Sequence, residues 1–107
     1  MKIYLAQFNP IVGDLEGNAK KIEGISLHAF KRSADLVLTP ELSLWGYPPK
    51  DLLFNRSLIK KQDKILNKLS HDIANKFGNL SIIIGIAETI DDNFFPNLYN
   101  SIALIEK

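Results

Sequence analysis

Apolar residues in this 107-residue chain follow two patterns, short unbroken runs and longer stripes with helical spacing. Unbroken runs are typical of strands that are buried on both faces, as in parallel sheets. We expect such strands at residues 3–8, 36–39 and 80–87, and a fourth strand at residues 98–106. The stripes repeat every three to four residues and predict amphipathic helices at residues 17–32 and 56–77.

Turn-forming residues lie between these segments. Asn9-Pro10 ends the first strand, and Gly13-Asp14 starts the turn into the first helix. Gly78-Asn79 follows the second helix, where glycine is the usual terminator. The polar run Asp91-Asp92-Asn93 predicts a turn between the last two strands.

The predicted order of elements is strand, helix, strand, helix, strand, strand, which indicates an α/β fold. Right-handed crossovers make the first three strands parallel, and the polar turn makes the last pair antiparallel, so the sheet is mixed. The two helices suffice to cover one face of this sheet. The other face is equally apolar and needs a cover that these residues do not supply, so we expect residues 1–107 to be an incomplete domain.

The stretch richest in candidate chemistry follows the second strand. It reads Thr39-Pro40-Glu41-Leu42-Ser43-Leu44-Trp45-Gly46-Tyr47-Pro48-Pro49-Lys50-Asp51-Leu52-Leu53. Glu41 comes where the strand ends, which is where open α/β sheets bind their ligands. Pro40, Gly46 and the Pro48-Pro49 pair restrict the backbone of the loop, so it costs little entropy to order.

Glu41 is the candidate general base. We expect its carboxylate to be partly enclosed by Leu42, Leu44, Trp45 and Tyr47. A carboxylate in such surroundings is harder to ionise than one in water, which suits proton transfer. Trp45 is better interpreted as a rigid part of the loop than as a contact to a substrate.

Composition and charge exclude several classes of function. The chain has 46% hydrophobic and 23% charged residues, as ordinary globular domains do, and its net charge of +1 attracts neither nucleic acid nor an anionic membrane. The basic residues between Arg56 and Lys76 are spaced as on a solvated helix face. There is no cysteine and no apolar run approaching the roughly 20 residues that span a bilayer.

Three motifs, spread over nearly the whole chain, resemble the carbon-nitrogen hydrolase (nitrilase) superfamily. They are Ala6-Gln7-Phe8-Asn9-Pro10-Ile11-Val12-Gly13-Asp14-Leu15-Glu16-Gly17-Asn18, the run from Pro40 to Leu53 quoted above, and Leu98-Tyr99-Asn100-Ser101-Ile102-Ala103. Within the superfamily the match is closest to the glutaminase domains of glutamine-dependent NAD synthetases. Such domains resemble a four-layer αββα sandwich. The resemblance therefore implies that residues 1–107 form its N-terminal portion, a partial sandwich with helices on one face.

The resemblance also implies roles for two residues. The glutamate that matches Glu41 is the general base of a Glu-Lys-Cys triad, and the tyrosine that matches Tyr47 helps to line the glutamine pocket. The nucleophilic cysteine and the oxyanion-binding lysine are absent here. Lys107 stands only seven residues after Asn100, at the end of the same predicted strand, which is too close for it to be that lysine. We accordingly expect the 107 residues alone to be inactive.

Further implications concern partners and cofactors. Glutamine would be the substrate, and the remainder of the synthetase chain would use the released ammonia, with ATP and magnesium, to form NAD from nicotinic acid adenine dinucleotide. We expect a cytoplasmic protein, because no apolar run suits a signal peptide or a bilayer span, and we expect a homo-oligomer. No cofactor site is expected within these residues, because the phosphate-binding glycine patterns and the Ser-Gly-Gly-x-Asp-Ser signature of the synthetase domain are absent.

Two alternatives stay open. One is a stand-alone amidase or nitrilase, which sequence beyond residue 107 would reveal by lacking Ser-Gly-Gly-x-Asp-Ser. The other is a non-catalytic interaction module built on the half-fold.

Three further residues are weaker candidates for a functional site: Glu88 is a second carboxylate at a strand end, and His28 and His71 lie on helices without metal-ligand spacing. We expect all three to be bystanders and no metal to bind.

Overall fold

The computed structural model describes residues 1–89 and 98–106. Its elements are, in order, β1 (Ile3–Leu5), α1 (Leu15–Lys31), β2 (Leu36–Leu38), the short 3₁₀ helix η1 (Lys50–Phe54), α2 (Arg56–Lys76), β3 (Ser81–Thr89) and β4 (Leu98–Ile105). Every predicted strand and helix is present in the predicted order, although β1 ends at Leu5 rather than at Phe8. The predicted turn at Asp91-Asp92-Asn93 and the excluded candidate Lys107 lie outside the described residues.

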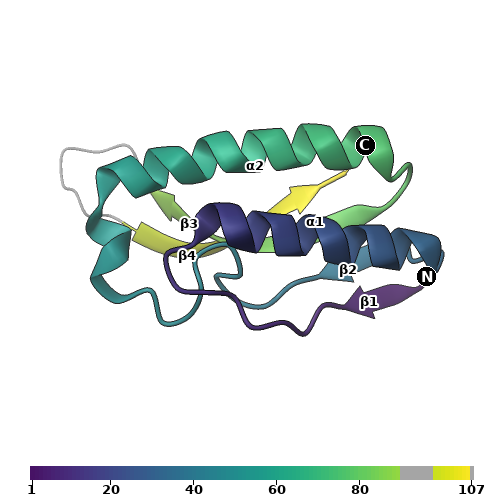
Figure 1. Ribbon diagram of the computed structural model, residues 1–107, viewed down its shortest axis with the longest axis horizontal. Helices are drawn as coiled ribbons and strands as arrows, with labels where there is room; N and C mark the ends of the chain where they lie inside the picture. The colour runs from purple at the N-terminus through teal and green to yellow at the C-terminus, as the bar shows by residue number, and fades with distance from the viewer. Residues whose placement is uncertain (90–97, 107) are drawn as a thin grey trace.

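The four strands form one mixed sheet in the order β1-β2-β3-β4. β1 pairs with β2 and β2 with β3 in parallel, whereas β3 and β4 are antiparallel, as the sequence predicted. The two helices lie side by side along the sheet (Figure 1). The strand register brings one buried row together beneath them, made of Val37, Ile82 and Ile105.

Within residues 1–89 and 98–106, no helix covers the opposite face of the sheet. Its residues are Ile3 and Leu5 of β1, Leu38 of β2, and Ile102 and Leu104 of β4, all of them exposed. The prediction that the first strand is buried on both faces is therefore wrong for these 107 residues, because both helices pack on the same side. The exposure of these side chains agrees with the expectation that one apolar face has no cover among these residues.

Side-chain caps set where the helices begin. Asp14 accepts a hydrogen bond from the backbone N–H of Gly17 at 3.0 Å, which starts α1 two residues earlier than predicted. Asn55 caps α2 in the same way through Ser57, at 3.0 Å. Gly78, just past α2, has a φ of +58°, which confirms the predicted glycine stop.

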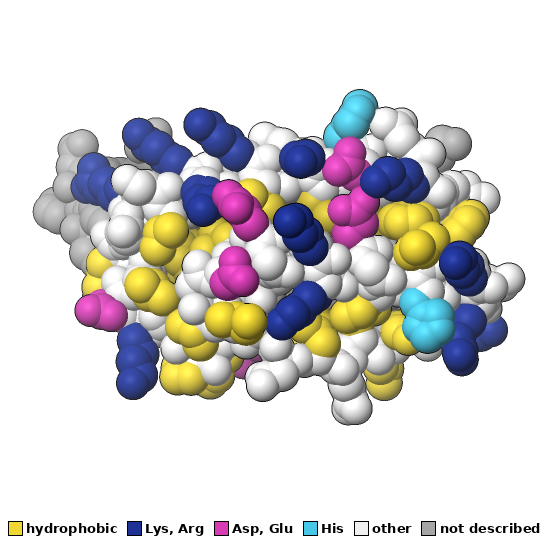
Figure 2. Space-filling view, in the orientation of Figure 1, with side chains coloured by type: hydrophobic (Ala, Val, Ile, Leu, Met, Phe, Trp, Pro, Cys, Tyr) yellow, Lys and Arg dark blue, Asp and Glu magenta, His cyan; other side chains and the backbone are white. Residues whose placement is uncertain are grey.

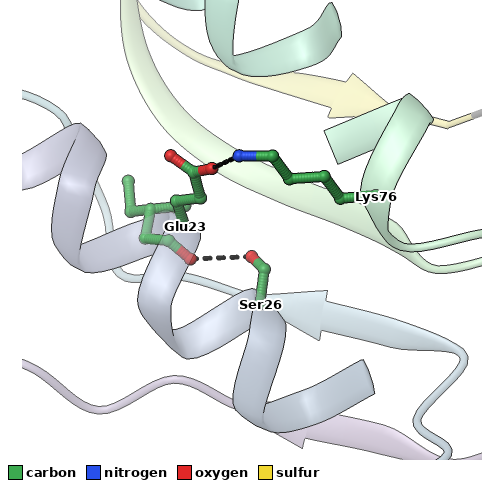
Figure 3. Close-up of polar contacts among 4 residues, drawn as sticks. Glu23, Ser26 and Lys76 are labelled. Carbon is green, nitrogen blue, oxygen red and sulfur yellow. Dashed lines mark hydrogen bonds and ion pairs between the residues drawn. The ribbon is translucent and has the colours of Figure 1, made fainter. Parts of the chain in front are cut away.

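The outer surface of the helices is charged and open to solvent. Figure 2 shows Lys and Arg side chains spread over this face with acidic ones among them, so the predicted solvated helix face is confirmed. Ion pairs join the two helices: Lys61 Nζ lies 3.2 Å from Glu16 Oε1, and Lys76 Nζ lies 2.7 Å from Glu23 Oε1 (Figure 3). The hydrogen bond and the charge of Glu23 raise the pKa of Lys76, but an exposed pair of this kind adds little to stability.

No helix in the described part of the chain is long and apolar enough to cross a membrane.

Candidate functional site

Glu41 stands at the carboxyl end of β2, where the sheet gives way to a tight turn. The last bond between β2 and β3 runs from the N–H of Thr39 to the carbonyl of Ile83, at 3.1 Å. The chain then turns back on itself, because the N–H groups of Trp45 and Gly46 both donate to the carbonyl of Leu42, at 2.9 Å each. The carboxylate is therefore carried on the first residues of a hydrogen-bonded turn rather than on a loose loop.

The partner of Glu41 comes from the far edge of the sheet. The side-chain amide of Asn100, on β4, donates to Oε1 of Glu41. The two residues are 59 positions apart in the chain. A carboxylate oxygen held by an amide donor keeps a defined orientation. Asn100 belongs to a motif that the sequence singled out, but its contact with Glu41 was not predicted.

Two hydroxyl groups fasten the turn to β3. Thr39 Oγ1 and Ser43 Oγ lie 2.7 Å apart, and Thr39 Oγ1 donates to the carbonyl of Ile83 at 2.9 Å. The N–H of Gly85 points at both hydroxyl oxygens, 3.3 and 3.2 Å away. A Cβ at Gly85 would lie 2.4 Å from the backbone nitrogen of Leu42, so only glycine allows the turn to sit this close to the strand.

The N-terminal motif holds the turn from its other side. Asn18 is fully buried; it accepts from the N–H of Ile11 at 2.9 Å and donates to the carbonyls of Ile11 and Leu44 at 2.8 and 3.0 Å. Gly13 adds a backbone bond to the carbonyl of Trp45 at 2.8 Å. Two motifs that are far apart in sequence thus form one hydrogen-bonded unit around Glu41.

The predicted enclosure of Glu41 is wrong. Leu42, Leu44 and Trp45 are buried in the core, while Glu41 is exposed and Tyr47 is 64% exposed. These apolar side chains of the turn belong to the buried hydrophobic core instead of lying over the carboxylate. Trp45 thus has the structural role that the sequence predicted, and within the described residues Tyr47 has a free surface from which to contact a ligand.

Glu88 belongs to a different face of the sheet. Its Oε2 accepts from the hydroxyl of Ser101 at 2.8 Å, whereas the neighbouring Asn100 bonds to Glu41. Successive residues of a strand point to opposite faces. Asn100 shares the uncovered face with Ile102, so Glu41 lies on that side and Glu88 on the other. This arrangement supports leaving Glu88 out of the candidate site.

The histidines have ordinary partners. His28 Nδ1 lies 3.3 Å from the hydroxyl of Tyr4, and His71 Nε2 lies 3.1 Å from the side-chain amide of Asn75. In residues 1–89 and 98–106 no group of three or more histidine or acidic side chains is placed to hold a metal ion. What the site offers is one oriented carboxylate, suited to take a proton from a nucleophile supplied by another segment.

Two buried polar residues beside the site were missed from sequence. Asn18 occupies a position on the apolar stripe of α1, and Gln62 occupies one on the stripe of α2. A polar residue at such a position needs a partner inside the core. A polar residue at a position where the helical pattern expects an apolar one is therefore the sequence signal that could have identified Asn18 and Gln62.

Comparison with known proteins agrees with the motifs. The family model described as carbon-nitrogen hydrolase matches residues 2–107. The chain is 40% identical, over 98% of its length, to the glutamine-dependent NAD(+) synthetase of Synechocystis sp., of which it covers 19%. It is 36% identical, over 99% of its length, to the synthetase of the same name from Thermotoga maritima, of which it covers 17%. The chain therefore spans less than a fifth of the length of these relatives.

Solved structures agree on the fold. The glutamine-dependent NAD+ synthetase of Acinetobacter baumannii, determined in complex with ADP, aligns with 97% of the chain at a TM-score of 0.84 and 33% identity, and 18% of that protein is covered. An amidase from Nesterenkonia sp. aligns with 82% of the chain at a TM-score of 0.67 and 22% identity, with 32% of it covered, which supports the same fold. With the match to the family model over residues 2–107, these likenesses show that the chain belongs to the carbon-nitrogen hydrolase family.

Proposed function

We propose that this chain is part of the glutamine amidohydrolase domain of a glutamine-dependent NAD synthetase. The observation that carries the proposal is the oriented carboxylate of Glu41, which stands at the end of β2 with Asn100 as its donor. The relatives that bear this name match nearly the whole chain, which favours the synthetase over a stand-alone amidase. The proposed setting is the cytoplasm, and the proposed assembly is a homo-oligomer.

In the proposed reaction a cysteine from the remainder of the protein attacks the carboxamide carbon of glutamine. Glu41 takes the thiol proton, and a lysine stabilises the negative charge on the oxygen of the tetrahedral intermediate. Ammonia leaves with a proton returned by Glu41, and water then releases glutamate from the thioester. A second domain, with ATP and magnesium, adenylates nicotinic acid adenine dinucleotide and uses the ammonia to form NAD. Tyr47 lines the glutamine pocket in this scheme.

Transfer of labelled nitrogen tests this function. The full-length protein, supplied with glutamine labelled with ¹⁵N in its side-chain amide, ATP, magnesium and nicotinic acid adenine dinucleotide, should place the label in the carboxamide of NAD. Mass spectrometry of the product measures this. Hydrolysis of glutamine without any NAD formed would point to the stand-alone amidase, and no hydrolysis at all would refute the enzyme.

We also propose that residues 1–107 are the N-terminal portion of the family domain and that a later segment of the same protein covers the uncovered sheet face. Ile102 is 67% exposed in these residues, and Leu27, on α1, is 42% exposed. Each is replaced by cysteine in the full-length protein, and labelling with a thiol reagent is followed by peptide mass mapping. Cysteine at 102 should react on the order of 100-fold more slowly than cysteine at 27, because reaction requires the covering layer to open. Equal rates would mean that the face stays open.

A further inference from the structure

Gln62 is a polar residue enclosed in the core between α2 and the sheet. Its side chain is only 2% exposed, and its neighbours on the apolar stripe of α2 include Ile59 and Leu69, which are buried as well. An amide in such surroundings is stable only if its oxygen and nitrogen have partners.

The contacts of Gln62 fix its amide completely in orientation. Its Oε1 accepts from the indole Nε1–H of Trp45 at 2.7 Å and from the backbone N–H of Ala87 at 2.9 Å. Its Nε2 donates to the backbone carbonyl of Ala87 at 2.7 Å. One side chain therefore joins α2, the turn after β2 and the last part of β3.

The contacts of Gln62 with Trp45 and with Ala87 both connect it to the surroundings of Glu41. Trp45 belongs to the turn that carries Glu41, and it closes that turn by donating its N–H to Leu42. Ala87 is paired across the sheet with Asn100, whose amide donates to Glu41. The same amide group thus constrains both the segment that bears the carboxylate and the strand pair that bears its hydrogen-bond donor.

We propose that Gln62 is a positioning residue for Glu41, an inference that rests on the proposed glutaminase function. Without the Gln62 amide, the indole N–H and the backbone groups of Ala87 would lose their partners inside the core. The turn and the end of β3 would then move relative to each other. Misplacement of a catalytic group by about 1 Å costs up to about 10²-fold in rate.

Three variants of the full-length protein test the proposal. Gln62→Met keeps the length of the side chain and removes its hydrogen bonds. Gln62→Glu keeps the acceptor oxygen and, because burial favours the protonated acid, also supplies a donor for Ala87. Ile73→Val is the matched control, since Ile73 is 1% exposed on the same helix, about three turns further along.

Steady-state glutamine hydrolysis is the first readout. Gln62→Met should lower kcat by about 10- to 100-fold and leave KM within about twofold, because the base is displaced while the substrate pocket is kept. Gln62→Glu should recover most of the lost kcat. Ile73→Val should keep the kcat of the unaltered protein, although it too loses core packing.

Hydrogen exchange of the backbone amides at residues 41–46 is the second readout, and it does not depend on activity. These amides should exchange at least about tenfold faster in Gln62→Met and at the unaltered rate in Ile73→Val. If the unaltered protein does not hydrolyse glutamine, the proposed function fails, and the exchange rates still decide whether Gln62 positions the turn.

The proposal is overturned if Gln62→Met and Ile73→Val agree in both kcat and exchange. Should Gln62→Met fail to fold, Trp45→Phe takes its place, because it removes the indole donor and keeps a smaller aromatic ring in the core. Trp45→Phe should then speed hydrogen exchange at residues 41–46 and lower kcat, as expected for Gln62→Met. Unaltered exchange and kcat in that variant would equally overturn the proposal.

Discussion

Glutamine hydrolysis by the full-length protein should fall by about 10³-fold when Glu41 is replaced by Gln, since a positioned general base contributes roughly 10²- to 10⁴-fold. The substitution keeps the shape of the side chain and an oxygen that accepts from Asn100, but the amide cannot take a proton. The loss should appear in kcat with KM for glutamine nearly unchanged. Release of glutamate, measured at saturating glutamine, gives the result directly.

Two controls separate this effect from damage to the fold. Ammonia supplied in place of glutamine should support NAD formation by the Glu41→Gln variant within about twofold of the unaltered rate, because that step bypasses the base. Glu88→Gln changes a second exposed carboxylate, which bonds to Ser101 on the other face of the sheet, and should leave glutamine hydrolysis within about twofold. A Glu41→Gln variant that retains a tenth or more of its kcat would exclude Glu41 as the base.

The sequence predicted the order and pairing of the elements because each rests on local chemistry. The apolar runs mark β2 and β3, and the glycine after α2 takes the left-handed conformation that ends the helix. The prediction failed at the ends of elements. α1 begins at Leu15 because Asp14 caps it, and β1 stops at Leu5 because its partner β2 ends at Leu38, whose carbonyl accepts the last bond from the N–H of Ala6.

The position of Glu41 was predicted, but its surroundings were not. Residues next to a carboxylate in sequence need not have side chains next to it in space. The backbone turn instead sends Leu44 and Trp45 into the core and leaves Glu41 exposed beside Asn100. Long-range pairing between β3 and β4 brings Asn100 to the site, and no local pattern contains that information.

For the polar residues that hold the site in place, the position is likewise visible in the sequence but the hydrogen-bond partners are not. Asn18 and Gln62 interrupt apolar stripes, so their positions were visible in the sequence, whereas their partners were not. Asn18 donates to the carbonyl of Leu44, and Gln62 accepts from the indole N–H of Trp45. Both partners belong to the turn of Glu41, which contacts the helices only in the folded protein. In this chain, a polar residue on an apolar helical stripe therefore marks a position whose side chain bonds to the turn of Glu41.

Gly46→Ala should destabilise the domain by roughly 2–5 kcal/mol. Gly46 has a φ of +80°, a conformation that costs an alanine about 1–2 kcal/mol. A Cβ there would also lie 2.7 Å from the Cα of Val12, and overpacking against backbone costs about 1–3 kcal/mol more. The melting temperature of the full-length protein, followed through the transition of this domain, measures the loss.

Gly24→Ala is the matched control for Gly46→Ala, because a Cβ at Gly24 would meet no atom within 4 Å and the residue lies inside α1. Alanine there should stabilise the domain by about 0.5–1 kcal/mol, through the lower helix propensity of glycine. If the melting temperature falls in Gly46→Ala and rises in Gly24→Ala, the strain caused by the added methyl group lies at the contact between the N-terminal motif and the turn of Glu41. If Gly46→Ala melts no lower than the unaltered protein, that contact is not close-packed, and the two motifs do not form the rigid unit that holds the carboxylate.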